Sequence, residues 1–175
     1  VTFKDDIKIK DGGTIGVASA ADAMTVSSAG IVTFKDDILI KDGGTIGVAS
    51  DADVITIAST GVTTFSKAVV GSTDTDTSNT GSVTLDFNTN QNFVLTFTGN
   101  VTLANPSTES VGQTGVIICI QDGTGSRTLS LGTDYETAGG AGITLSTAAS
   151  AVDVIPYVVK ASGSIQLGAP QLAFS

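Results

Sequence analysis

Hydrophobic and polar residues alternate over the first ten positions of the chain. In VTFKDDIKIKD, Val1, Phe3, Ile7 and Ile9 fall on one side of an extended strand, and threonine and lysines fall on the other. An Asp-Gly-Gly turn signal follows, then the alternating piece TIGV, a loop, and a third short run that ends at Gly30. The pattern predicts short strands joined by turns, with little or no helix.

This pattern is written twice. Val1–Ile31 returns as Val32–Val62 with 23 of 31 positions identical, and a third copy begins at Thr63 and then dissolves. Repeats of this length are typical of units that bury their apolar side by stacking on neighbours. We therefore predict an elongated β-structured shaft over residues 1–65. Because Val1 is the first position of a repeat, we also expect further copies upstream.

One repeat carries too few large apolar side chains to form a core by itself. We expect three identical chains wound about a common axis, so that the alternating apolar residues form a shared trimer core. A single-chain β-solenoid would explain the same periodicity and is the structural alternative. The predicted trimer core consists of Val1, Phe3, Ile7, Ile9, Ile15, Val17, Val32, Phe34, Ile38, Ile40, Ile46, Val48, Ile55 and Ile57.

Asp5 and its repeat equivalent Asp36 break the apolar alternation. A bulge or register change between Phe3 and Ile7 would turn the carboxylate outward. The other explanation is a ring of symmetry-related carboxylates near the axis that holds a cation or water. Both explanations remain open from the sequence.

The composition changes after the repeats. Residues 66–82 are polar and turn-prone, and we predict a flexible junction there. The Thr-Asp alternation at 73–77 is too short and too poor in glycine for a calcium loop. Residues 83–175 then predict a compact β-sandwich or jelly-roll-like head. Its expected strands are Val83–Phe87, Phe93–Thr98, Val101–Ala104, Val116–Gln121, Thr128–Leu131, Ile143–Ser146, Val152–Val159, Ser164–Leu167 and Leu172–Phe174.

Two of these runs, Val116–Ile120 and Val154–Val159, are apolar on both sides. Such strands are either central in the sandwich or pressed against another subunit.

The net charge and the scarcity of basic residues, histidine and cysteine narrow the possible functions. The chain has 175 residues, a net charge of −9 and only eight lysines and arginines, which disfavours a nucleic-acid partner. It has no histidine and one cysteine, so zinc sites and Ser-His-Asp or Cys-His catalytic groups are excluded. Cys119 lies in an apolar run and is expected to be a buried structural thiol. We expect no cofactor, no metal and no membrane insertion.

Two phrases carry a resemblance to a known family. One is VTFKDDI.IKDGGTIGVAS in the repeats, and the other is GSVTLDFNTNQNFVLTFTGNVTLANP, with IQDGTGSRTLSLGTDYETAGGAGITLSTAASAVDVIPYVVKASGSI, in the second half. They resemble tail-fibre-type structural proteins of marine tailed bacteriophages, especially those that infect cyanobacteria. The resemblance implies a homotrimeric virion fibre with a β-structured shaft and a C-terminal head, anchored to other virion proteins at its N-terminal end. It implies a place either on the tail, where the head attaches to a host-surface glycan or protein, or on the capsid.

The resemblance fixes no binding residue, so candidate receptor contacts come from two polar segments of the head. These candidates are Asp122, Thr124, Ser126, Arg127, Asp134, Tyr135 and Glu136. A capsid fibre or connector with a purely structural role is the alternative function, and a bacterial adhesin stalk also fits the repeats. A polysaccharide depolymerase would use paired carboxylates. The chain has no tryptophan, and its Asp5/Asp6 and Asp36/Asp37 pairs are periodic, so we expect no enzyme.

Overall fold

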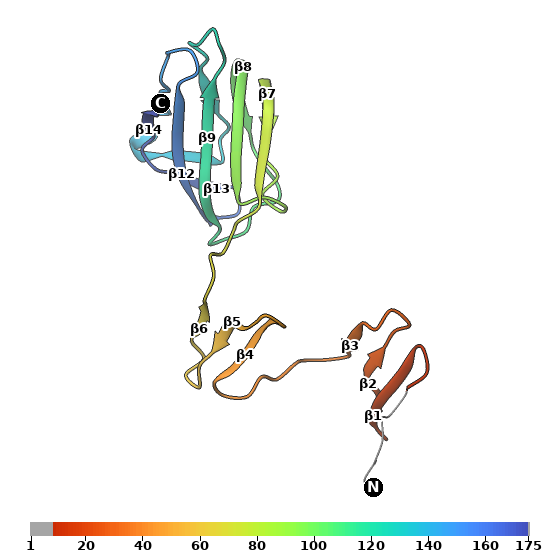
Figure 1. The fold of residues 1–175 in the computed structure, drawn as a ribbon. Coiled ribbons are helices and arrows are strands. Elements are labelled where there is room, and N and C mark those ends of the chain that lie inside the picture. Colours follow the sequence, from red (N-terminus) through yellow and green to blue (C-terminus); the bar gives the residue numbers. More distant parts are fainter. Residues whose placement is uncertain (1–8, 175) are drawn as a thin grey trace. The chain divides into compact units, whose positions relative to one another are not determined.

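The computed structural model describes residues 9–174 and divides the chain into two compact units, Val1–Val69 and Val70–Ser175 (Figure 1). Strands dominate both units, which confirms the predicted all-β class. Within the described residues, the single helical element is the short 3-10 turn η1 (Ala138–Gly140). No helix of the described part is long and apolar enough to cross a membrane.

The first repeat forms a three-stranded antiparallel sheet of β1 (Gly13–Val17), β2 (Ala20–Val26) and β3 (Val32–Phe34). Its register places Ile15 opposite Met24 and Met24 opposite Phe34. Directly opposed residues share a face of a sheet, so these three side chains form one apolar row. The next residues along the register, Thr14, Thr25 and Thr33, form a threonine row on the other face.

The second repeat builds the same sheet from β4 (Gly44–Val48), β5 (Asp51–Ile57) and β6 (Thr63–Phe65). Ile46, Ile55 and Phe65 repeat the apolar row of the first sheet. The third strand of each sheet comes from the start of the next sequence copy. The fragment of a third copy at Thr63–Phe65 therefore completes the second sheet.

Glycine at the start of β4 permits a close approach. A side-chain carbon on Gly44 would collide with Cγ2 of Ile40, and Gly13 has the same relation to Ile9. Gly13 and Gly44 are buried, whereas the residues that follow them in their strands are exposed. Each isoleucine thus lies over the first residue of its sheet, and the glycine provides the space.

The long alternating strand predicted at the start of each repeat is wrong for the second copy. The strand ends at Phe34, and the chain bends at Lys35 and Asp36. Asp36 is exposed and Ile38 is 62% exposed. Asp36 therefore lies in a bend and not in a strand. Asp5 lies outside the described residues.

The head begins with two long parallel strands, β7 (Thr73–Thr84) and β8 (Asn92–Ala104). Their pairing is irregular around Asn79. The first half of β8 pairs with β9 (Thr114–Gln121) and the second half with β10 (Leu129–Leu131), both in parallel. Residues 73–82, which the sequence predicts as flexible junction, are thus ordered as a strand, because a strand at the edge of a sheet can be polar throughout.

The remaining strands close the head. β12 (Val152–Ala161) runs antiparallel to β9, β13 (Ser164–Leu167) and β14 (Gln171–Phe174), and β11 (Tyr135–Thr137) runs parallel to β13. One sheet of eight strands wraps around a single core, in a sandwich-like arrangement (Figure 1). The parallel pairs distinguish it from a jelly roll of antiparallel strands.

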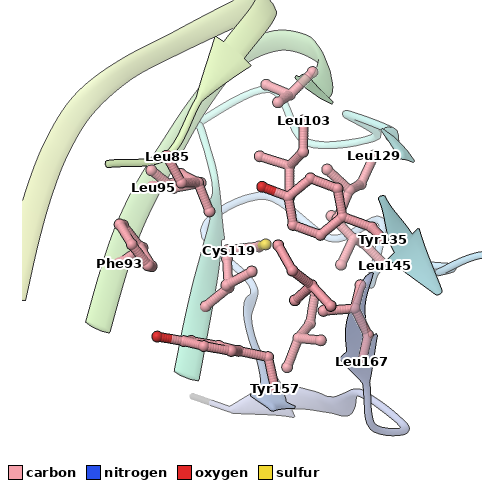
Figure 2. Close-up of a cluster of buried hydrophobic side chains, with 14 of the residues drawn as sticks. Leu85, Phe93, Leu95, Leu103, Cys119, Leu129, Tyr135, Leu145, Tyr157 and Leu167 are labelled. Carbon is pink, nitrogen blue, oxygen red and sulfur yellow. The ribbon is translucent and has the colours of Figure 1, made fainter. Parts of the chain in front are cut away.

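The core is built by alternation along the long strands (Figure 2). Phe93, Leu95 and Phe97 of β8 are all buried. Phe93 and Tyr157 pack on Phe87 with ring centroids 5.0 and 5.2 Å away. Such aromatic contacts add to the stability gained by burying apolar area.

Cys119 lies in the same core (Figure 2). Its burial, with the nearby Asp153 carboxylate, raises the pKa of the thiol to about 12. A thiol that stays protonated is a poor nucleophile. The buried structural cysteine predicted from the sequence is confirmed.

Residues 143–146, predicted as a strand, form none. They are held instead by the buried carboxylate of Asp153 on β12. Asp153 accepts hydrogen bonds from the backbone N–H and the hydroxyl of Ser146, both at 2.7 Å, and from the backbone N–H of Ala173 at 2.9 Å. One carboxylate therefore ties the 143–146 segment and β14 to the centre of the sheet.

We predict that Asp153→Asn destabilises the head by about 1–3 kcal/mol. The amide NH2 of asparagine would face N–H or O–H donors where Asp153 now presents an acceptor oxygen, so a buried polar group would lose its hydrogen bond. Urea unfolding of the full chain measures this. Asp76→Asn is the matched control, because Asp76 is exposed and its carboxylate accepts one local hydrogen bond, from Ser78. Equal stability of the two variants would contradict the assigned role of Asp153.

Candidate functional site

The polar turn Asp122–Arg127 follows β9 and is organised by one carboxylate. Asp122 accepts hydrogen bonds from the backbone N–H groups of Thr124 at 3.0 Å and Gly125 at 2.9 Å. It also accepts two from the Arg127 guanidinium, at 3.1 and 2.7 Å. The hydrogen bonds from Arg127 and from Gly125 hold the pKa of Asp122 below its ordinary value.

The side chain of Gln121 closes the base of this turn. It donates to the carbonyl oxygen of Arg127 at 2.9 Å and accepts from the Arg127 N–H at 2.8 Å. Ser126 has a φ of 61° and donates its N–H to the carbonyl of Thr147 at 2.9 Å. The turn is thus fixed at its base, along its carboxylate and to a neighbouring segment, which is the preorganisation that a binding loop needs.

These contacts divide the predicted residues of the turn into two kinds. Arg127 and Asp122 form an ion pair at 2.7 Å and are mostly covered, with side chains 27% and 19% exposed. Thr124 and Ser126 are exposed. The exposed side chains of this turn therefore carry hydroxyl groups, whereas the Arg127 guanidinium is held against Asp122.

The second predicted segment, Asp134–Glu136, is different. Tyr135 points into the core (Figure 2) and is 6% exposed, so its prediction as a receptor contact is wrong. Its position on β11 alternates with the outward-facing Glu136, and burial raises the pKa of its phenol. Glu136 accepts hydrogen bonds from Ser164 at 2.7 Å and Lys160 at 3.1 Å.

The structure does not bring the two segments together. Ser126 and Arg127 line one shallow depression with Ile143 and Thr144, whereas Glu136 lines another with Gln166. The residues 143–144 escaped the sequence prediction because their apolar and β-branched character indicated a strand. Asn105, which accepts from the Asp134 N–H at 3.1 Å and donates to Thr133 at 2.7 Å, was also missed, and its Asn-Pro pair was the available signal.

The pKa of Glu136 is shifted in the direction opposite to that of a glycosidase general acid. A general acid needs a raised pKa. The hydrogen bonds from Ser164 and Lys160 lower the pKa of Glu136. Across residues 9–174, no three or more Asp, Glu, Cys or His side chains are grouped so as to hold a metal ion.

The structure describes eleven of the fourteen predicted trimer-core residues of the shaft. Val1, Phe3 and Ile7 lie outside the described residues. Ile9, Ile40, Ile55 and Ile57 are half-buried in the single chain. The remaining predicted core residues are exposed: Ile15, Val17, Val32, Phe34, Ile38, Ile46 and Val48.

We predict that the head loses stability in acid. The folded-state pKa values of Asp122, Glu109 and Glu136 are lowered, so the unfolded chain binds more protons as the pH falls. The stabilisation is complete above the unfolded-state pKa of about 4–4.5 and is lost as the pH falls through the folded-state values.

Thermal unfolding between pH 7 and pH 3 measures the effect. Asp122→Asn should lower the Tm at pH 7 and reduce the further loss in acid. Asp134→Asn is the control, since that carboxylate accepts only a weak hydrogen bond, at 3.4 Å from the adjacent Thr133. A Tm that is constant to pH 3 would refute the assignment.

Comparison of this sequence with known proteins and protein families identifies the family of the chain. Neither the curated proteins nor the solved structures contain a match to this chain. The profile of the family described as "Putative phage tail fibre C-terminal domain" matches residues 73–164, which is more than half of the chain and spans β7 to the first residue of β13. The chain therefore belongs to the phage tail fibre C-terminal domain family, and it is a structural fibre component of a virion.

Proposed function

We propose that this chain is part of a non-enzymatic, homotrimeric tail fibre: the repeats form a shaft and the head attaches the particle to the host surface. The observation that carries the proposal is the one-sided character of the repeat sheets. In the single chain, Ile15 and Phe34 are each 45% exposed, and Ile46 and Phe65 are 47% and 51% exposed. Large apolar side chains repeated on one face of successive sheets need a partner surface.

The sheets are too small to be stable without that surface. Strands of three to seven residues in an isolated three-stranded sheet bury little. Covering one Phe or Ile side chain contributes about 1.5–3 kcal/mol, and the repeat multiplies this term. Three identical chains around one axis would let every apolar row face inward and every threonine row face water.

The head supports the attachment part of the proposal. Its Asp122–Arg127 turn is rigidly held and presents hydroxyl and backbone groups, which suit weak hydrogen bonding to a glycan or a protein surface. Three heads per fibre and several fibres per particle convert weak contacts into firm attachment. The family description favours the tail over the capsid as the place of the fibre. We also propose a marine, cyanobacterium-infecting phage as its source, on the resemblance of the repeat and head phrases.

We predict that Phe34→Ser weakens assembly of the full chain. Losing about 1.5–3 kcal/mol of burial per chain should raise the concentration needed for assembly at least about tenfold. Sedimentation equilibrium measures the change. Thr33→Ser, on the opposite face of the same strand, should leave assembly unchanged. A monomeric parent protein at micromolar concentration would overturn the homotrimer.

We predict that Thr124→Lys reduces host adsorption severalfold, because a long charged side chain replaces an exposed hydroxyl at the tip of the turn. The assay is competition by purified fibre for adsorption of the parent phage. Ser130→Lys is the control, because Ser130 is exposed in a neighbouring strand outside the turn. Equal competition by both variants would remove this turn from the attachment surface.

A further inference from the structure

The head sheet has an outer face that is apolar in its middle and polar at its ends. In the row across four neighbouring strands, Thr75 of β7 lies beside Val94 of β8, then Ile118 of β9, then Val154 of β12. These strands lie side by side in Figure 1. The strand neighbours of Val94 and Ile118, and Ile155 beside Val154, lie in the core, so these three residues face outward, and Thr75 is exposed beside them.

The adjacent rows repeat this composition. Opposed residues share a face, so the register assigns the outer face residue by residue. The apolar outer face of the head, as we use the term below, consists of Val94, Val116, Ile118, Ile120, Val152, Val154, Pro156, Val158 and Phe174.

The ends of the same sheet show the contrast. Thr102 lies beside Ser130 on β8 and β10, and Glu136 lies beside Gln166 on β11 and β13. These outward positions are polar, as expected for a sheet face in water. The apolar outer face is therefore confined to the centre of the sheet and is not a general property of the fold.

This face is also free of charge. The chain carries a net charge of −9, yet each of the nine residues is uncharged and apolar. The outward-facing Thr75, Thr96 and Thr114 border it. At the end of β12 the first charged group is Lys160, which pairs with Glu136 at 3.1 Å. An apolar centre with a polar border is the anatomy of a protein interface.

We propose that the apolar outer face of the head is the surface through which the heads of identical chains join. The inference rests on the proposed homotrimeric fibre and names the head surface that would hold its chains together. It also answers why β9 and β12 are apolar on both sides: one side fills the core and the other meets a second copy.

Three observations favour a second copy over a host component. Acidic copies repel one another, and a charge-free face lets them approach without that repulsion. The face is made of Val, Ile and Pro, with one Phe and no Tyr, Trp or Arg, so it resembles a core cut in half, as in permanent complexes. Three strands about 4.8 Å apart and about 20 Å long give roughly 300 Å², which fits inside a standard interface of about 800 Å² per partner.

The test places a nitroxide spin label on Thr75→Cys of the full chain, at the polar border of this face. Cys119 is buried and its thiol pKa is raised, so it should react with the label far more slowly than an exposed cysteine. Ser130→Cys carries the label on the polar part of the sheet as a control. We expect the label at position 75 to be immobilised and dipolar-broadened by its copies, and the label at position 130 to be mobile.

A second variant, Ile118→Glu, adds charge to the middle of the face and should abolish the broadening at position 75 while circular dichroism stays unchanged. Ser130→Glu, with the same charge elsewhere, should leave the signal intact. An assembled protein with a mobile label at position 75 would overturn this inference and leave the homotrimer standing. Immobilisation only after host envelope is added would assign the face to a host partner instead. A monomer would refute both proposals.

Discussion

Burial of one-sided apolar surface is the constraint on which this structure depends. In each repeat, a sheet of three short strands places Ile, Met or Phe on one face and threonine on the other. In the described part of the chain, Ile15 and Phe34 of the first sheet and Ile46 and Phe65 of the second remain about half exposed. Each repeat therefore leaves an apolar surface that its own short strands do not bury, as is typical of units that stack on neighbours.

The head solves the same problem within one chain. Its long strands β7 and β8 pair with each other in two stretches, one near each end. On its other edge, β8 pairs with β9 along its first half and with β10 along its second half. The core then receives side chains from nearly every strand. Carboxylates hold segments of the head by accepting hydrogen bonds from them. Asp153 holds β14 and residues 143–146, and Asp122 holds the turn after β9. Glu109 accepts a hydrogen bond from the N–H of Gly163 at 2.8 Å.

The sequence predicted much of the strand content, since the apolar, β-branched runs of β9 and β12 and the alternation of β13 are strong local signals. It failed where tertiary context decided. β7 is polar enough to be taken as a linker, and only pairing with β8 makes it a strand. Residues 143–146 alternate like a strand, but Ser146 donates its hydrogen bonds to the Asp153 carboxylate and the segment pairs with no strand. Tyr135 was predicted at the surface because its neighbours are charged, yet β11 turns it inward.

The sequence by itself determined the repeat, the all-β class and the absence of histidine chemistry, because period and inventory are properties of the chain alone. Three features were decided only by the tertiary structure. The third strand of each repeat sheet comes from the next sequence copy, and Arg127 is held by Asp122. A charge-free face lies across β8, β9 and β12. The reason is physical: alternation gives each strand two sides, and only the pairing of distant strands fixes which side meets the core.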